Sequence, residues 1–376
     1  MAYPNFNLAR LLTTVFEPVQ GSRVCILIDL DDPQLIKDFA FLDRDGYSVQ
    51  KKAHEVFYNG LQKGVAEELN LSGGDIFAFQ TTGGSNLDLP DTCVSPDGET
   101  HQLEEAVYPK YDLILCISDY SATAPLTAFA KKYGFRGSTM HGLNDIILAS
   151  GLSVNYEEVS AEAEKLRLGM THADAVEIDT EIDGRKETLR IELGKQDAQK
   201  SHGLCKGTAP DIANLPAGEV YYVPKSAEGC FPIKHEDGTI TFNHVKDGSI
   251  VDIELVSGDP AIVAAHKAKI TSDPVTGRLG ELGFGTQVLP FAEADIQDEK
   301  VLGTVHVATG RSDHLGGDLL PSMFAEASNA THDDLLLHPL KTPEINLTQV
   351  RLYRNGREEV LIENYKPAAY MMALLA

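Results

Sequence analysis

The sequence predicts a mixed α/β protein, in which an N-terminal α/β domain built on a parallel sheet is followed by a β-rich mixed α/β domain. Two observations carry this prediction. In the first half, continuous apolar runs alternate with segments of helical spacing, which is typical of parallel strands covered by helices. In the second half, short alternating runs are separated by turn dipeptides, which indicates antiparallel hairpins. We therefore expect two domains, at residues 1–174 and 175–376.

The N-terminal domain is predicted from strands and helices in alternation. Val24–Leu30 (VCILIDL) is a continuous apolar run, as expected for a strand that is buried on both faces. In Tyr47–Leu69, apolar residues recur every three or four positions, which indicates a helix. Three further elements follow the same logic: strands at Ile76–Gln80 and Asp112–Ser118, and a helix at Ala124–Tyr133 that ends at Gly134.

A domain of this kind can bind a nucleotide, but its glycines do not indicate one. Thr81–Ser85 (TTGGS) follows a strand, yet it lacks the Gly-x-Gly-x-x-Gly spacing, so we interpret it as a structural turn. Asp29, Asp31 and Asp32 end the first strand and are interpreted as helix-capping or solvated acids. An amphipathic segment at Asn155–Gly169 predicts the helix that leads out of this domain.

Charge and composition exclude several classes of partner. The formal net charge of -24 argues against nucleic acid, because a phosphate backbone would be repelled. No apolar run reaches the roughly 18 residues that a membrane helix needs, and Met1–Leu12 lacks a signal-peptide pattern. The five cysteines form no Cys-x-x-Cys unit, so neither a thiolate zinc cluster nor a disulfide framework is indicated. We expect a cytoplasmic protein without a membrane partner.

The C-terminal domain is predicted to be rich in hairpins. The signals are four Asp-Gly or Asn-Gly dipeptides, at Asp183-Gly184, Asp237-Gly238, Asp247-Gly248 and Asn355-Gly356. One helix is expected at Pro260–Ile270, where the alternation stops.

Four stretches of this domain place a metal-ligand type of side chain on a strand or a glycine-rich turn. Thr331–Leu337 predicts a strand, so His332 and Asp334, two residues apart, share one face. The other stretches supply one residue each: Glu219 at the start of an apolar strand, Glu281 among glycines, and His306 in the middle of a strand.

Three carboxylates and two imidazoles are the donors that a pair of divalent ions needs. The carboxylates offset the charge of the metals and can bridge them, while the imidazoles take terminal positions and leave room for water. Taken one at a time, the same residues also fit structural roles. Glu219 could be a strand-edge acid, and His306 could be a hydrogen-bonded core histidine.

The second half resembles the aminopeptidase T and aminopeptidase S family of metallo-aminopeptidases, also called thermophilic metallopeptidases or leucyl aminopeptidases. The N-terminal half matches this family only in its general α/β character. Four stretches carry the resemblance, in the family's order: NLPAGEVYYVP at Asn214–Pro224, GELGFGT at Gly280–Thr286, GTVHVATG at Gly303–Gly310 and ASNATHDD at Ala327–Asp334.

The resemblance implies a metal-dependent aminopeptidase or related amide hydrolase that acts on a peptide or small amide. It implies that two divalent ions, Zn, Co or Mn, activate a water that attacks the scissile carbonyl. Glu281 would serve as the catalytic base for that water as well as a ligand. A homodimer is implied too. The implied metal ligands are Glu219, Glu281, His306, His332 and Asp334.

This sequence departs from the family pattern at Asp313. The family has a tyrosine at this position, seven residues after the histidine of the third stretch. An aspartate adds charge where a phenol would donate a hydrogen bond to the oxyanion. His314 and Asp318 lie in the same glycine-rich loop, either with local roles at the site or as plain polar loop residues.

Two other functions fit the same residues. Dihydroxypyridine ring-cleaving dioxygenases resemble the same family and hold one iron with two histidines and one carboxylate, which would be His306, His332 and Asp334. A non-catalytic binding protein that keeps the fold is the third hypothesis, suggested by Asp313. The presence of both Glu219 and Glu281 makes the two-metal hydrolase the leading hypothesis.

Overall fold

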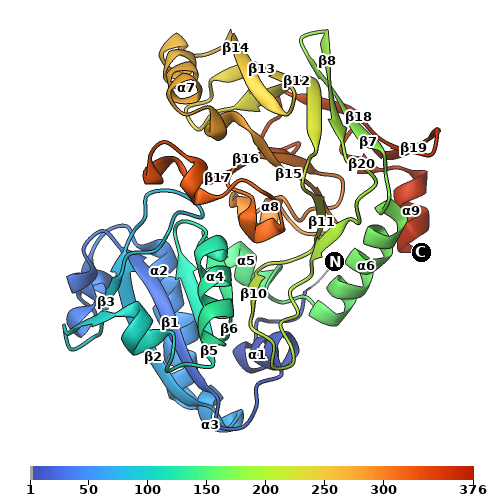
Figure 1. The fold of residues 1–376 in the computed structure, drawn as a ribbon. Helices are drawn as coiled ribbons and strands as arrows, with labels where there is room; N and C mark the ends of the chain where they lie inside the picture. The colour runs from blue at the N-terminus through green and yellow to red at the C-terminus, as the bar shows by residue number, and fades with distance from the viewer. Residues whose placement is uncertain (1–2) are drawn as a thin grey trace. The chain divides into compact units, whose positions relative to one another are not determined.

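The computed structural model describes residues 3–376 and divides into two compact units (Figure 1). The first unit comprises the chain up to Ser160 together with His202–Ala217, and the second comprises Ala161–Ser201 together with Gly218–Ala376. The first unit is built on a largely parallel sheet with helices and the second on antiparallel sheets, so the predicted fold class is confirmed.

The sheet of the first unit has seven strands, in the order β10-β6-β5-β1-β2-β3-β4. The strands from β10 to β2 are parallel to one another, while β3 and β4 add an antiparallel edge. The central strand β1 is buried on both faces, as its apolar run predicts. The bounds are β1 Arg23–Leu30, β2 Ser72–Gln80, β3 Thr92–Val94, β4 Thr100–Gln102, β5 Leu113–Ser118, β6 Arg136–His141 and β10 Asp211–Asn214.

The helix predicted at Tyr47–Leu69 forms, but it is not a regular α-helix. It contains π-helical turns at Ala53–Tyr58 and Leu61–Val65 and breaks at Gly64, whose φ is 130°. Its α-helical parts are α2, Ser48–Lys52, and α3, Ala66–Glu68. The other α-helices that begin in this unit are α1 Leu8–Phe16, α4 Thr123–Tyr133, α5 Asp145–Ala149 and α6 Tyr156–Met170.

Two of the three aspartates that end β1 have defined structural roles. Asp32 caps the 3-10 helix η1, Pro33–Asp43, by accepting a hydrogen bond from the amide of Gln34. Asp29 is buried and accepts hydrogen bonds from Gln50 Nε2, at 2.6 Å, and from the amide of Asp119, at 3.0 Å. Burial, together with the charge of Asp119, raises the pKa of Asp29 to about 6.

Asp29→Asn is therefore expected to stabilise the protein above pH 6. An acid whose pKa is raised on folding loses stability as the pH rises from its unfolded value to its folded one, here about 6. The difference should reach roughly 2–3 kcal/mol. The amide can keep the contacts, because Gln50 Oε1 is buried and lacks a hydrogen-bond partner within residues 3–376. Urea unfolding of both proteins at pH 4.5 and pH 7.5 measures this; an equal difference at both pH values would contradict it.

The second unit contains an eight-stranded antiparallel sheet and a five-stranded antiparallel sheet. The larger has the order β14-β13-β12-β8-β7-β18-β19-β20, and each predicted Asp-Gly or Asn-Gly turn connects two of its adjacent strands. Its bounds are β7 Ala175–Ile182, β8 Arg185–Glu192, β12 Ser226–Lys234, β13 Ile240–Lys246, β14 Ser249–Ser257, β18 Asn346–Arg354, β19 Arg357–Glu363 and β20 Lys366–Pro367.

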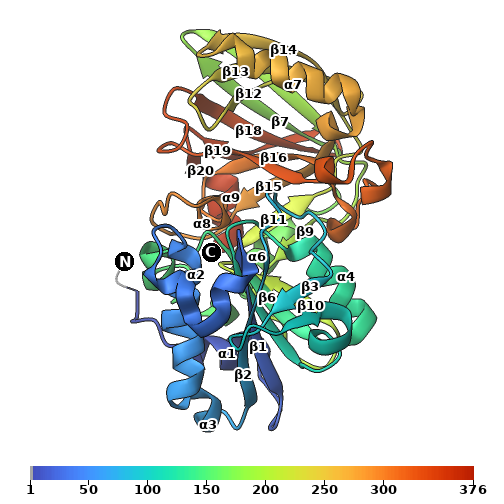
Figure 2. The same cartoon turned by 90° about the vertical axis from the view of Figure 1, so that its left-hand side faces the viewer.

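The five-stranded sheet has the order β17-β16-β15-β11-β9. Residues such as Val220, Leu282, Phe284, Val305 and Val307 join its apolar face to one core with residues of the larger sheet, so the two sheets share a hydrophobic interior. Helix α7 lies against β14, which is an edge strand of the larger sheet (Figure 2). The bounds are β9 Gln199–Ser201, β11 Glu219–Tyr222, β15 Leu279–Gly285, β16 Val305–Gly310, β17 His332–Leu337, α7 Pro260–Ser272, α8 Asp295–Asp298 and α9 Ala369–Leu375.

Within residues 3–376, no helix combines the length and the apolar character that a membrane crossing would require. The five cysteines are free and buried, which is typical of cysteines that pack as small apolar side chains.

Candidate metal centre

Three adjacent strands bring four of the predicted ligands to the polar face of the five-stranded sheet. Ala308 of β16 pairs with Glu281 of β15 on one side and with Asp334 of β17 on the other, so the two carboxylates lie in one row across the sheet. His306 and His332 each lie two residues from a member of that row along their own strands. Because side chains alternate along a strand, all four project from the same face.

Two glycines of β15 make room on this face. Glu219 begins β11 opposite Gly285, which places it on the same face. A Cβ at Gly283 would lie 2.1 Å from Cε1 of His306, so only glycine leaves space for that imidazole. A Cβ at Gly285 would lie 2.1 Å from the carbonyl oxygen of Val301, so this glycine admits the backbone that follows α8. The glycines of the GELGFGT stretch therefore shape the site.

The ligand atoms converge closely. His332 Nε2 lies 2.9 Å from Glu281 Oε2 and 3.3 Å from Asp334 Oδ1. His306 Nε2 lies 3.7 Å from Glu281 Oε1 and 3.9 Å from Asp334 Oδ1. Glu219 Oε2 is 3.8 Å from the same nitrogen. Bonds of about 2.0–2.2 Å to one ion place its ligand atoms about 3–4 Å apart, so this spacing fits a bound cation.

One atom of the cluster makes no hydrogen bond that would explain its burial. Asp334 Oδ1 is buried and has no hydrogen-bond partner anywhere in the described chain. Its nearest cationic neighbours are the imidazoles of His332, at 3.3 Å, and His306, at 3.9 Å, so a metal ion that displaces their protons would have to satisfy this oxygen instead. Together with the donor types, this oxygen indicates that the residues present fit a metal ion.

The two histidines differ in how they are held. Nδ1 of His332 lies 2.6 Å from the carbonyl oxygen of Arg311, which can only accept, so Nδ1 donates to it, and Nε2, which contacts Glu281 at 2.9 Å, can bind a metal once it loses its proton. Nδ1 of His306 is buried and finds no such acceptor among residues 3–376. His332 is therefore the better oriented of the two as a metal ligand.

The carboxylates raise the pKa of both imidazoles. Burial alone would lower the pKa of His306, but Glu281 and Asp334 raise it to about 9, and for His332 they raise it well above its usual range. Burial would raise the pKa of Glu281, yet the two imidazoles hold it below its usual range. A cation that binds here must displace those protons, so its affinity should increase with pH.

A buried ion pair beside the cluster was not predicted from the sequence. Lys300 is wholly buried, and its Nζ donates to Glu219 Oε2 at 2.8 Å and to Glu299 Oε1. Burial alone would lower the pKa of Lys300, but the two carboxylates raise it, so the ammonium stays charged. In the sequence, Asp298-Glu299-Lys300 is typical of a solvated turn after a short helix. The only signal in the sequence for the burial of this turn is Gly285, because its missing side chain makes room for the backbone at Lys300 and Val301.

The loop after β16 contains Asp313, where the sequence departs from the aminopeptidase pattern, together with His314 and Asp318. Asp313 accepts a hydrogen bond from Arg311 Nε at 2.7 Å, so its charge is compensated within the loop. His314 packs edge-on against His332, with ring centroids 5.0 Å apart, and burial lowers the pKa of His314 to about 3. Asp318 is exposed to solvent. Asp313 therefore offers neither a phenol nor a free carboxylate to a substrate.

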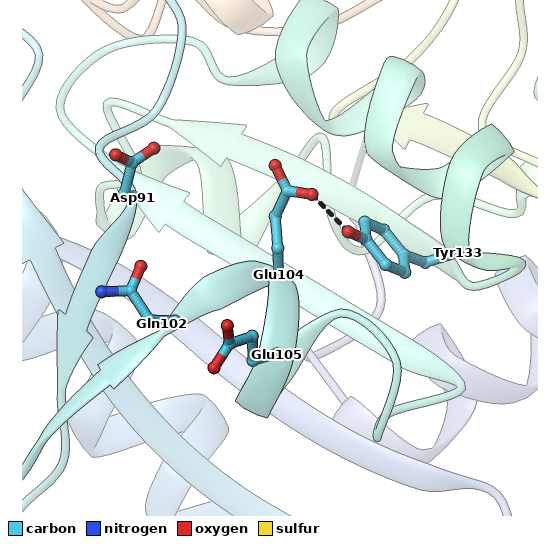
Figure 3. Close-up of a pocket in the computed structure, with 5 residues that line it drawn as sticks. All are labelled: Asp91, Gln102, Glu104, Glu105 and Tyr133. Atoms are coloured by element: carbon cyan, nitrogen blue, oxygen red, sulfur yellow. Dashed lines mark hydrogen bonds between the residues drawn. The ribbon is translucent and has the colours of Figure 1, made fainter.

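Two other groups of polar side chains, both in the first unit, lie at the surface and lack the burial of the cluster. The first unit has an open pocket of about 390 Å³ lined by exposed polar side chains and Tyr133, which donates a hydrogen bond to Glu104 (Figure 3). The remaining lining residues are Asp91, Gln102 and Glu105. The group Asp97, Glu99 and His101 has metal-ligand types, but its carboxylates are solvent-exposed. Exposed acids are common without a ligand, so the buried cluster remains the candidate site.

Comparison with known proteins gives one structural match to discuss. No known protein-family model matches the sequence, and no curated protein matches it. The structure is similar to that of 2,5-dihydroxypyridine dioxygenase from Pseudomonas putida KT2440, with a TM-score of 0.59 over 93% of this chain and 92% of that chain. The sequences are 14% identical, so the similarity concerns the fold.

This match corrects the leading hypothesis from the sequence. The expected membership of the aminopeptidase T and aminopeptidase S family is wrong, and so are the hydrolase and the protease activity drawn from it. The fold is similar to that of the matched dioxygenase over 93% of this chain, including the half that resembled aminopeptidases only in general character. The loop after β16 is consistent with this correction. Asp313 stands at the position of the family's tyrosine, and its carboxylate pairs with Arg311.

Proposed function

We propose that this chain is a mononuclear non-haem iron dioxygenase that opens a dihydroxylated heteroaromatic ring. The observation that carries the proposal is the convergence of His332, Glu281 and Asp334 on one buried point of a fold shared with a dihydroxypyridine dioxygenase. His306 lies beside this group and supplies the second histidine, and two-histidine, one-carboxylate sites with open positions are typical of such iron enzymes. We propose in addition that the metal is iron in the ferrous state and that one ion binds.

His332, Asp334 and Glu281 would hold the ion, with His306 as a fourth donor. The first three have ligand atoms within 4.8 Å of one another. The hydrogen bond from His332 Nδ1 to the Arg311 carbonyl keeps Nε2 available, as second-shell contacts do in metal sites. His306 faces the same carboxylates from the other side, at 3.7 Å from Glu281. The four donors include the triad expected from the sequence, His306, His332 and Asp334, with Glu281 as a second carboxylate that faces both imidazoles.

A ferrous ion would supply open coordination positions and the one-electron chemistry by which a spin-paired ring can react with dioxygen. In the overall reaction a ring carbon–carbon bond breaks and both atoms of dioxygen enter the product, so no external reductant is needed. The protein's own contribution is positional. Glu281 and Asp334 supply negative charge that offsets the cation, and the strands of a packed sheet fix their spacing.

Oxygen consumption tests the proposal. The purified protein is stripped with a chelator, loaded anaerobically with Fe²⁺, and mixed with 2,5-dihydroxypyridine, other dihydroxypyridines and catechol in an oxygen electrode. We expect one dioxygen consumed per ring lost, with the ring's ultraviolet absorbance disappearing at the same rate. The Zn²⁺-loaded protein is the control and should consume none. Fe²⁺-loaded protein that leaves every ring in the panel intact would contradict the proposal.

A further inference from the structure

The cluster contains more ligand atoms than one ion needs. Besides the group of Glu281, His332 and Asp334, two further groups have ligand atoms within 4.8 Å of one another: Glu219 with Glu281 and His306, and Glu299 with His306 and Asp334. Four buried or partly buried carboxylates in one site could bind two divalent cations, as carboxylate-rich centres do.

Lys300 forms ion pairs with two of these four carboxylates. Its ammonium lies against Glu219 and Glu299, and the side chain is inaccessible to solvent. These are the two carboxylates that do not belong to the group around His332. A cation bound between Glu219 and Glu299 would therefore meet a fixed positive charge in a poorly solvated place, where like charges repel strongly.

We propose that the ammonium of Lys300 takes the place of a second divalent cation and restricts this centre to one metal ion. The inference rests on the proposed metal site at His332, but it does not depend on the reaction. The charges agree with it. One ammonium and one divalent ion carry three positive charges against at most four negative charges on Glu219, Glu281, Glu299 and Asp334, whereas a second divalent ion would raise the positive charge to five.

The proposal predicts that a single substitution creates a second metal site. Lys300→Met keeps a long apolar side chain but removes the charge, which leaves Glu219 and Glu299 buried without a counterion. These carboxylates, with His306 beside them, are the donors that a divalent ion prefers. Wild-type protein saturated with Co²⁺ and then desalted should retain one equivalent, and Lys300→Met should retain two.

Two variants act as controls for this count. Lys341→Met removes a lysine that pairs at 2.6 Å with Asp295, which belongs to none of the ligand groups, and should leave the count at one. The triple variant Lys300→Met, Glu219→Gln, Glu299→Gln removes the donors together with the ammonium and should return the count to one. The metal is measured by plasma mass spectrometry, and magnetic coupling between adjacent Co²⁺ ions in Lys300→Met provides a second readout.

The outcomes separate this inference from the proposed function. A folded Lys300→Met protein with one equivalent, or wild-type protein with two, would overturn it. If Lys300→Met does not fold, titration of the wild type with excess Co²⁺ decides: binding that stops at one uncoupled ion supports the inference, and a second, coupled ion refutes it. Absence of oxygen consumption would count against the dioxygenase without changing the metal count.

Discussion

His332→Ala is expected to abolish metal binding at the centre and to reduce iron-dependent oxygen consumption by more than about 100-fold, since loss of second-shell contacts alone costs 10–100-fold. His332 Nε2 is the donor closest to both Glu281 and Asp334, and its Nδ1 is tied to the backbone of Arg311. His306 belongs to the adjacent strand, and His314 lies in the loop after β16 with its ring centroid 5.0 Å from that of His332, so neither occupies the place of the His332 side chain. Isothermal titration with Co²⁺ and the oxygen electrode measure the two effects.

His338→Ala is the matched control for this variant. His338 follows the same strand and is as buried as His332, at 3% against 4% exposed, but it stacks on Phe291 outside the cluster. Its loss should lower the melting temperature and leave the metal affinity within about threefold, because it removes the stacking on Phe291 and the hydrogen bond that Nδ1 accepts from the amide of Leu340, but no donor of the cluster. Metal binding by His332→Ala at wild-type affinity would show that the site has been placed on the wrong residues.

Glu281→Gln is expected to weaken metal binding by more than about 100-fold, whereas Glu219→Gln should weaken it less than about tenfold. Both residues were predicted as ligands, but their surroundings differ. Glu281 faces both imidazoles, while Glu219 directs Oε2 to Lys300 at 2.8 Å. Glutamine keeps the shape of each side chain and removes its charge, so the pair compares a ligand with a partner of the ammonium.

Competition against a fluorescent chelator measures the two affinities, with thermal unfolding to confirm that both variants fold. In Glu219→Gln, Lys300 keeps Glu299 as its counterion, so the fold should tolerate the change. Equal losses in the two variants would mean that Glu219 is a ligand of the same rank as Glu281, and the assignment of Glu219 to Lys300 would be wrong.

Much of the fold could be predicted because the relevant signals are local. The apolar run of Val24–Leu30 indicates a strand buried on both faces, and Asp183-Gly184 fixes a two-residue hairpin turn, whatever the rest of the chain does. Interruptions such as the π-helical turns at Ala53–Tyr58 depend on packing against other elements. They leave the helical spacing nearly unchanged, so the sequence predicts one helix there.

The site could be predicted only in part, for a related reason. His332-x-Asp334 shows its geometry in the sequence, since residues two apart on a strand share a face. The burial of Lys300 depends on Gly285, a residue fifteen positions earlier on another element. Such a long-range contact leaves no periodic signal, and a Glu-Lys pair after a helix is usually solvated. The sequence does not show that Lys300 pairs with Glu219 and Glu299, so the number of carboxylates favoured a two-metal hydrolase over a one-metal oxygenase.

The most direct test of the central claim is the origin of the oxygen atoms in the product. Fe²⁺-loaded protein is supplied with ¹⁸O₂ and a dihydroxypyridine in unlabelled water, and the product is analysed by mass spectrometry. A dioxygenase acting at the His332 centre predicts a ring-opened product that contains both ¹⁸O atoms, formed by His338→Ala and not by His332→Ala. A product whose new oxygen comes only from water would contradict the account, because it would show hydrolysis and not cleavage by dioxygen.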